Sequence, residues 1–411
     1  MTTSTTPHAP LASSPAPSTA SRSLWAACLA HALHDGYTDG LYAFLPVWQA
    51  QFGLSYAALA LVRALYYGTM GGLQIPADRV LRGWSPRAAL MLSTLLAAAG
   101  LLLMALPLGF GGLCAGLVLA GIGSSIQHPR GSMLVTDAFG AAARRPLGIY
   151  NFSGDLGKAA LPALVALLLP LMAWRPVLGL MALLGVGVLA ALATMAPGSP
   201  SARPAPTTTT TTAAGRSRAG FRILATIGAL DTATRMGYLL FLPFLVHGRG
   251  GGSPTVGLAL ALLFLGGAFG KFAFGWLGER LGVVRCVMLS EAVTALLIAA
   301  TLATPLTATL VLLPLLGMFL NGTSSVLYGT VPELSDGDTG RSFAVFYTSV
   351  IGAGGIAPIL YGALADYTNR TVALLATAAT AAAILPLVRA LGPHLNNARP
   401  SPDHGRQGSA R

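Results

Sequence analysis

Apolar runs of about twenty residues recur along the whole chain, and no other feature constrains its fold as strongly. As a helix, each run is long enough to cross a hydrocarbon core roughly 30 Å thick. The chain has 411 residues, of which 54% are hydrophobic and 9% are charged. A soluble protein of this length could not cover its surface with so few charges. The sequence therefore predicts an all-α, polytopic membrane protein.

The pattern of apolar runs predicts twelve membrane spans, six on each side of a low-complexity stretch at 197–220. This stretch is rich in Pro, Ser and Thr and has too little apolar surface to fold, so we expect a linker. The expected spans are 24–50, 56–80, 86–107, 111–136, 146–170, 174–196, 221–247, 254–278, 283–304, 308–332, 341–364 and 370–392.

The linker divides the chain into two predicted six-helix bundles, 24–196 and 221–392, and we expect the tails 1–23 and 393–411 to be disordered. Arginines gather in the segments that follow the even-numbered spans. Because basic loops are translocated poorly, both termini and the linker are expected in the cytoplasm, with the chain in the plasma (inner) membrane. The net charge of +12 is therefore a topology signal, and no nucleic-acid partner is expected.

The two halves resemble each other. "YAFLPVW" in the first span is echoed by "LLFLPFL" in the seventh, and "ADRVLRG" after the second span is echoed by "GERLGVVR" after the eighth. Two parallel copies of a six-helix unit are a transporter architecture, with the substrate site between the copies near the middle of the membrane. The repeat therefore predicts a small-molecule transporter.

Together these features make the chain resemble the major facilitator superfamily of transporters. "GWLGERLGVVR" is similar to that superfamily's Gly-x-Leu-x-Asp-Arg-x-Gly-x-x-Arg loop, with Glu279 in the Asp place, whereas the first-half copy has Gln74 and Leu81 where glycines are expected. The resemblance implies that Asp78 pairs with an arginine or a helix end on a neighbouring span and holds one conformation. The residues implied in conformational gating are Asp78, Arg79, Gly275, Glu279 and Arg280.

Within the superfamily, three segments are most similar to the fosmidomycin-resistance-type drug exporters. They are "HDGYTDGLYAFLPVWQAQFGLSYAALALV", "GIGSSIQHPRGSMLV" and "IYNFSGDLGKAALP". The resemblance implies a proton-driven exporter of small molecules. Asp155 and Lys158 depart from it, because those exporters tend to be uncharged at this place.

The first span carries charge on one face. His31, Asp35 and Asp39 are four residues apart and share a helical stripe, with His34 to one side. Asp35 is expected roughly 16 Å inside the membrane. Charges at this depth need partners or protons, and repulsion between the carboxylates favours a proton on one of them, the property of a proton carrier. A polar network that only fixes helix packing is the alternative.

Depth along the helices suggests partners for these acids. Lys158 is expected level with Asp35, and Arg63 level with Asp39. Asp155 and Lys158 are three residues apart and could simply neutralise each other. The functional alternative is that Lys158 binds an anionic or polar substrate while the acids exchange protons.

Other polar residues inside spans are further candidates for the substrate and proton pathway. His128 could relay protons or only pack. Arg130 needs an acid, and Asp35 or Asp155 is available. Lys271 could instead reach towards Glu279 at the membrane surface. The remaining candidates are Asp231 with Arg235 as a second internal pair, and Asn321 for hydrogen bonding to substrate.

The leading hypothesis is a proton-coupled exporter, an antiporter of a small molecule or drug, that works by alternating access as a monomer. The alternative is a proton-coupled importer or uniporter of a polar or anionic metabolite. No serine elbow or His-Glu-x-x-His motif is present, so we expect no enzyme activity, no cofactor and no metal site. Cys28, Cys114 and Cys286 have no paired spacing and are expected to be small buried hydrophobes.

Overall fold

The computed structural model describes residues 17–196, 218–335 and 339–398, and in these ranges the regular structure is entirely helical. The first part holds α1 (Pro17–Phe52), α2 (Tyr56–Gly72), α3 (Gln74–Val80), α4 (Pro86–Ala105), α5 (Gly109–Phe139), η1 (Gly140–Ala142), α6 (Arg144–Leu168) and α7 (Trp174–Met195). The second part holds α8 (Arg218–His247), α9 (Ser253–Leu281), α10 (Val283–Ala303), α11 (Leu306–Leu334), α12 (Thr339–Tyr367) and α13 (Arg370–Ala398).

Several helices run past the predicted span ends. α1 begins at Pro17, inside the stretch expected to be a disordered tail, and α13 continues to Ala398. α8 likewise begins at Arg218, inside the predicted linker. Adding a residue to an existing helix avoids the cost of nucleation, so helices extend beyond the apolar segment that starts them. The rest of the predicted tails and linker lies outside the described residues.

The second predicted span is not one helix. α2 ends at Gly72, and α3 restarts at Gln74 after Leu73, whose ψ of 0° departs from helical geometry. Pro76 explains the break, because it has no N–H to bond to the carbonyl four residues earlier, at Gly72, and its ring crowds that carbonyl. The acidic-Arg segments expected as loops are also helical. Asp78 lies in α3 and Glu279 in α9, and only Gly282, at φ +77°, separates α9 from α10.

Nine of the described helices are long and apolar enough to cross a membrane. They are α4, α5 and α7 to α13. α1 and α6 are long but carry the charged residues discussed above, and α2 has only 17 residues. Large apolar side chains remain on the outside, among them Phe272 (80% exposed) and Val311 (77% exposed), as expected for a surface that faces lipid. The chain is a multi-pass membrane protein.

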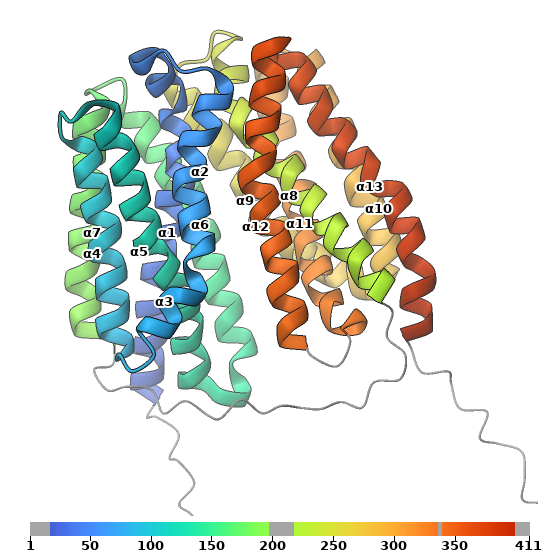
Figure 1. Cartoon of the computed structure of the whole chain (residues 1–411), viewed down its shortest axis with the longest axis horizontal. Coiled ribbons are helices and arrows are strands. Elements are labelled where there is room, and N and C mark those ends of the chain that lie inside the picture. The colour runs from blue at the N-terminus through green and yellow to red at the C-terminus, as the bar shows by residue number, and fades with distance from the viewer. Residues whose placement is uncertain (1–16, 197–217, 336–338, 399–411) are drawn as a thin grey trace, which may run out of the picture.

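The helices form two groups (Figure 1). α1 to α7 pack on one another, α8 to α13 pack on one another, and the groups meet along two seams, α2 with α12 and α6 with α9. We name the two ends of the molecule by their connections. The α1–α2 end holds the link between Phe52 and Tyr56, and the α7–α8 end holds Met195 and Arg218.

Glycines set the distance between α1 and α6. A Cβ atom at Gly157 would collide with the carbonyl oxygen of Ala32, and one at Gly36 would lie 2.9 Å from the carbonyl oxygen of Gly157. Small residues let helix backbones approach closely in membranes, where apolar burial gives little drive for association. The α1–α6 contact therefore depends on Gly157.

We predict that Gly157→Ala lowers the free energy of unfolding by about 1–3 kcal/mol, the usual cost of overpacking. The matched control is Gly187→Ala on α7, where no atom lies within 4 Å of the added methyl group. The control is expected to be neutral or slightly stabilising, because Ala favours helix over Gly. Thermal unfolding in detergent measures both, and equal unfolding temperatures would contradict the packing argument.

Candidate functional site

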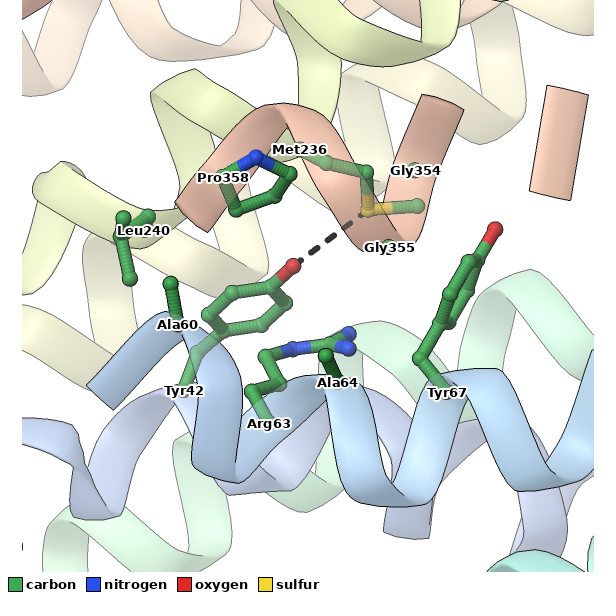
Figure 2. A pocket seen from close by; sticks show the side chains of 10 residues that line it. All are labelled: Tyr42, Ala60, Arg63, Ala64, Tyr67, Met236, Leu240, Gly354, Gly355 and Pro358. Atoms are coloured by element: carbon green, nitrogen blue, oxygen red, sulfur yellow. Dashed lines mark hydrogen bonds between the residues drawn. The ribbon is translucent and has the colours of Figure 1, made fainter. Parts of the chain in front are cut away.

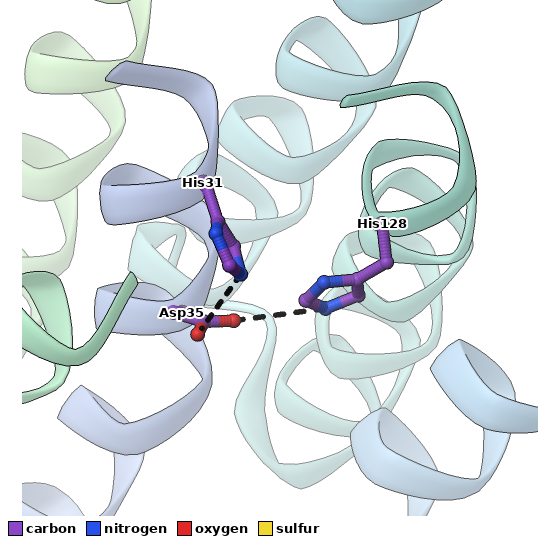
Figure 3. A group of neighbouring side chains, drawn as sticks. All are labelled: His31, Asp35 and His128. Atoms are coloured by element: carbon purple, nitrogen blue, oxygen red, sulfur yellow. Dashed lines mark ion pairs between the residues drawn. The ribbon is translucent and has the colours of Figure 1, made fainter. Parts of the chain in front are cut away.

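Asp35 of α1 is the centre of a buried charged cluster. Its Oδ2 lies 3.3 Å from Nε2 of His31 and 3.2 Å from Nζ of Lys158, and its Oδ1 lies 3.6 Å from Nε2 of His128. Figure 3 shows the two imidazoles, from α1 and α5, pointing at this one carboxylate. The residue as a whole is 6% exposed. The predicted pairing of Asp35 with Lys158 is present.

Gly154 of α6 makes room for this cluster. A Cβ atom there would lie 2.6 Å from Oδ2 of Asp35 and 2.7 Å from the His31 ring. The sequence analysis did not select Gly154. Its position, one residue before Asp155 and one turn before Lys158, could have indicated that it lies beside the charged residues.

The contacts of His31 place a proton in the cluster. Nδ1 of His31 lies 2.8 Å from the carbonyl oxygen of Tyr150, which can only accept, so Nδ1 carries a hydrogen. Nε2 then faces the Asp35 carboxylate, and a bare lone pair there would repel it. The contact therefore needs one proton between His31 and Asp35.

The two lysines of the chain meet at Asp155. Its Oδ1 lies 3.9 Å from Nζ of Lys158 on the same helix and 2.5 Å from Nζ of Lys271 on α9. The suggestion that Lys271 reaches towards Glu279 is therefore wrong, because α9 packs on α6 and turns Lys271 towards that helix. The side chains of Lys158 and Lys271 are 27% and 32% exposed. The Lys271–Asp155 pair joins the two groups of helices.

A small cavity, with room for about one water molecule, lies between the two groups (Figure 2). Tyr42 and Arg63 line one side and Met236 the other, and the Tyr42 hydroxyl donates across the seam to the Met236 sulfur at 3.4 Å. The remaining lining residues are Ala60, Ala64, Tyr67, Leu240, Gly354, Gly355 and Pro358. The lining is mostly apolar, with the Arg63 guanidinium as its one charged group.

Arg63 is held in this cavity by three groups. Nη2 lies 3.4 Å from Oδ1 of Asp39, as the depth argument predicts. Its guanidinium lies 4.1 Å from the ring centre of Tyr42 and 5.5 Å from that of Tyr67, which stabilises the cation through the ring faces. The sequence analysis missed Tyr67 and Met236, since aromatic and Met residues in apolar runs give no signal of their own.

Asp231 and Arg235 form the expected internal pair on α8. Nη2 of Arg235 lies 3.1 Å from Oδ2 of Asp231 and donates to the Thr232 hydroxyl at 3.1 Å. A further acid, Glu291 of α10, lies within hydrogen-bonding reach of Asp231 and is 2% exposed. The sequence analysis passed over Glu291, although a carboxyl inside the predicted span 283–304 was the signal applied to Asp35.

Arg130 lies outside the charged cluster around Asp35 and pairs with Asp78. Its Nη2 lies 3.2 Å from Oδ1 of Asp78 and donates to the Asp78 carbonyl at 3.0 Å, so the expected partners Asp35 and Asp155 are wrong. Arg130 lies near the C-terminal end of α5, beside α3, at the α7–α8 end. Asp78 thus has an arginine on a neighbouring span, in the arrangement that the superfamily resemblance implied.

Four other gating candidates lie on the surface or near it. Arg79 and Glu279 are exposed, and Arg280 lies over the Trp276 ring with 4.0 Å to its centre. At Gly275 no atom lies within 4 Å of where a Cβ would stand, so close packing does not require this glycine.

His34 and Asn321 lie within helix packing. His34 is fully buried, 2.8 Å from the Ser124 hydroxyl and 3.4 Å from that of Thr94. The Asn321 amide donates to Gly317 of its own helix at 3.1 Å, and its side chain fills the space beside Gly267. Neither residue reaches the charged cluster or the cavity.

One group of side chains has ligands of the kind that metals use. Ligand atoms of His31, Asp35 and His128 all lie within 4.8 Å of one another. The Lys158 ammonium already lies against Asp35, so a metal ion would have to displace a cation that is part of the chain.

Apolar helices around a charged seam define a membrane transporter, and comparisons identify its family. The sequence model of the Major Facilitator Superfamily matches residues 27–226 and 224–410, and the chain belongs to this superfamily. It is 25% identical over 368 residues to the fosmidomycin resistance protein of Escherichia coli (strain K12), which covers 84% of this chain and 87% of that protein. The resemblance inferred from the motifs is confirmed.

Solved structures share the fold. A bacterial homologue of the human lysosomal transporter Spinster, in an inward-facing and unoccupied conformation, has a TM-score of 0.74 at 16% identity, covering 95% of this chain and 100% of that one. A POT peptide transporter in complex with sulfate has a TM-score of 0.75 at 14% identity, covering 92% of this chain and 95% of that one.

We predict that Asp155 and Lys271 are energetically coupled. A double-mutant cycle of Asp155→Asn and Lys271→Gln should give a coupling energy of about 0.5–3 kcal/mol, the range for residues in contact. The matched cycle pairs Lys271→Gln with Glu279→Gln and should be additive within about 0.5 kcal/mol. Unfolding in detergent measures both, and coupling to Glu279 instead would contradict the observed pairing.

Proposed function

We propose that this chain is a proton-coupled exporter, an antiporter of a small molecule or drug, that works as a monomer by alternating access. The observation that carries the proposal is the position of Asp155, between Lys158 of its own group of helices and Lys271 of the other. A charge shared across the seam makes contact between the groups sensitive to protonation and to substrate.

Twelve spans in two related halves are part of the proposal, with α2 and α3 counted as one span. The contacts support the repeat, because α2 packs on α12 as α9 packs on α6, and α4 packs on α7 as α10 packs on α13. Two copies related by a two-fold axis generate such paired contacts. The buried charges of α1 and α6 face the seam, so both helices can still span the membrane.

Proton coupling follows from competition for the acids. When a proton neutralises Asp35, Lys158 loses its partner at 3.2 Å and turns to Asp155, which it already approaches to 3.9 Å. Lys271 must then share Asp155, and the α6–α9 seam weakens. A substrate with an acceptor group would act on the same lysines, so proton and substrate compete for one network.

Export is favoured by the relative named for fosmidomycin resistance. Import or uniport of a polar or anionic metabolite is the second candidate, supported by Lys158 and by Arg63 in the cavity. Uptake of labelled compounds into intact cells separates the two directions.

At the α1–α2 end, a contact crosses the other seam. The Asp366 carboxylate of α12 accepts hydrogen bonds from the backbone N–H groups of Tyr56 at 2.8 Å and Ala57 at 2.9 Å. These are free N–H groups at the N-terminus of α2, where a negative charge is favoured. Gly362 permits the approach, since a Cβ atom there would lie 2.7 Å from the Ala57 nitrogen.

We propose that the α7–α8 end lies in the cytoplasm of a plasma (inner) membrane protein with both termini inside, and the arginines at that end support this orientation. In this orientation the α1–α2 end is external.

We predict that Asp366→Ala opens the external end. An exposed hydrogen bond to a charged group is worth about 1 kcal/mol here, which is roughly a fivefold rise in the open population. An Ala64→Cys reporter in the cavity, with the three native cysteines replaced, should react correspondingly faster with an impermeant thiol reagent added outside. Thr368→Ala at the same end is the control, since Thr368 bonds only within its own helix among the described residues. An unchanged labelling rate in Asp366→Ala would contradict the proposal that Asp366 holds the α1–α2 end together.

We predict that the protein raises the drug tolerance of a pump-deficient bacterium and that Asp35→Asn abolishes the increase. Asn cannot exchange a proton with His31, so the coupling is lost. Asp137→Asn, at an exposed aspartate on α5, is the matched control and should keep the tolerance. A broad compound panel gives the measurement. Tolerance that survives in Asp35→Asn would contradict the proton role of Asp35.

A further inference from the structure

A second buried acidic pair lies in the other group of helices, away from Asp35. Asp231 of α8 is 3% exposed and Glu291 of α10 is 2% exposed, and the two carboxyl groups lie within reach of each other. Two ionised carboxylates buried side by side repel each other, so this arrangement favours a proton on one of the two groups.

The charges around the pair lead to the same conclusion independently. The acids Asp35, Asp39 and Asp155 of the first group face three cations, Arg63 and Lys158 of the same group and Lys271 of the second group. In the second group, two acids share one guanidinium, that of Arg235, at 3.1 Å from Asp231. A second full negative charge here would be buried without a cation, at a cost of several kcal/mol.

The other groups that face the pair cannot supply the missing charge. Glu291 lies near the Thr323 hydroxyl on α11, and that hydroxyl donates to Ser290 at 2.6 Å. The titratable neighbours of Asp231 and Arg235 on other helices are Tyr328 of α11 and, beside Arg235, Tyr67 of α2 and Asp39 of α1. None of these adds a cation, so a proton is what balances the pair.

Helix packing alone does not require carboxyl groups here. Ser93 of α4 donates to the backbone of α5 at Gly123, and Ser290 of α10 donates to the backbone of α11 at Phe319. The next residue is Thr94 in the first case, bonded to His34, and Glu291 in the second. On α4, the Thr94 hydroxyl and the His34 imidazole make this contact between helices without a carboxyl group.

A buried hydroxyl beside the pair also lacks a partner. The Oγ1 atom of Thr294, one turn after Glu291 on the same face of α10, has no hydrogen-bond partner among the described residues and is 1% exposed. Such a group normally bonds to protein or water. It extends the polar face of α10 beyond the pair.

We propose that Asp231 and Glu291 hold one proton between them and form a second proton-binding site, in the group of helices opposite to His31 and Asp35. Its part in transport rests on the proposed function, whereas the proton itself does not. The site lies beside Arg235, whose neighbours Tyr67 and Asp39 belong to the cavity and the first group. Loss of the proton would add a negative charge beside Arg235. Its guanidinium would then be held more strongly by Asp231 and Glu291 and less strongly by Asp39 of the first group.

Infrared spectroscopy of the full-length protein in detergent tests the proton directly, by exchange of H₂O for D₂O. The wild type should show the C=O stretch of a hydrogen-bonded carboxylic acid that shifts on deuteration. Glu291→Gln should lose this band, because Gln supplies the donor that Asp231 needs without a titrating proton. Glu333→Gln, at an exposed glutamate on α11, is the matched control and should keep it.

Arg235→Gln tests the charge balance in the opposite direction. With the guanidinium removed, both carboxyl groups should be protonated and the acid band should grow. Asp231→Asn provides a second removal, should Glu291→Gln not give a monodisperse protein. An acid band of wild-type size in both Glu291→Gln and Asp231→Asn would overturn the proposal.

Proteoliposomes separate this site from the proposed function. With a compound to which the protein confers tolerance, Glu291→Gln should slow transport driven by a pH gradient about fivefold or more, while exchange at equal pH is retained. If no compound is transported by the wild type, the proposed function fails and the infrared result still decides the proton site. If gradient-driven transport by Glu291→Gln equals that of the wild type, the pair has no part in coupling.

Discussion

The structure depends on one constraint: a charge taken out of water into a helical membrane protein needs an opposite charge or a proton beside it. Most of the buried acids and bases of the first group of helices obey it through contacts between different helices, such as Asp39 with Arg63 and Asp35 with Lys158. The pair of Asp155 and Lys271 extends the rule to the seam between the two groups. Helix positions and charge positions are therefore not independent.

Close helix packing makes these pairs possible. Lys158 reaches Asp35 because α1 and α6 approach at Gly154 and Gly157, where side chains would block them. The segment "SGDLGK" thus combines two requirements, small residues that let the helices approach and charged residues that use the approach. Packing and electrostatics share the same turns of α6, and a change in either would disturb the other.

Depth along a helix is the part of the site that sequence reasoning obtained correctly. A fixed rise per residue sets the height of each side chain, so Lys158 could be matched to Asp35 and Arg63 to Asp39. Height says nothing about which helices are neighbours or which way a residue faces around the helix axis. For that reason the partners expected for Arg130 and Lys271 were wrong, and Glu291 was not connected to Asp231.

The sequence by itself determined that the chain is a helical membrane protein of the major facilitator type, with charge concentrated in a few helices. Apolar length and local motifs carry this information, because membrane crossing is a property of a single segment. Only the tertiary structure decided which charges meet, that both lysines converge on Asp155, and that the two halves close at Asp366. The contacts of Lys271 with Asp155 and of Asp366 with Tyr56 join residues more than one hundred positions apart, and their geometry exists only when all the helices are packed.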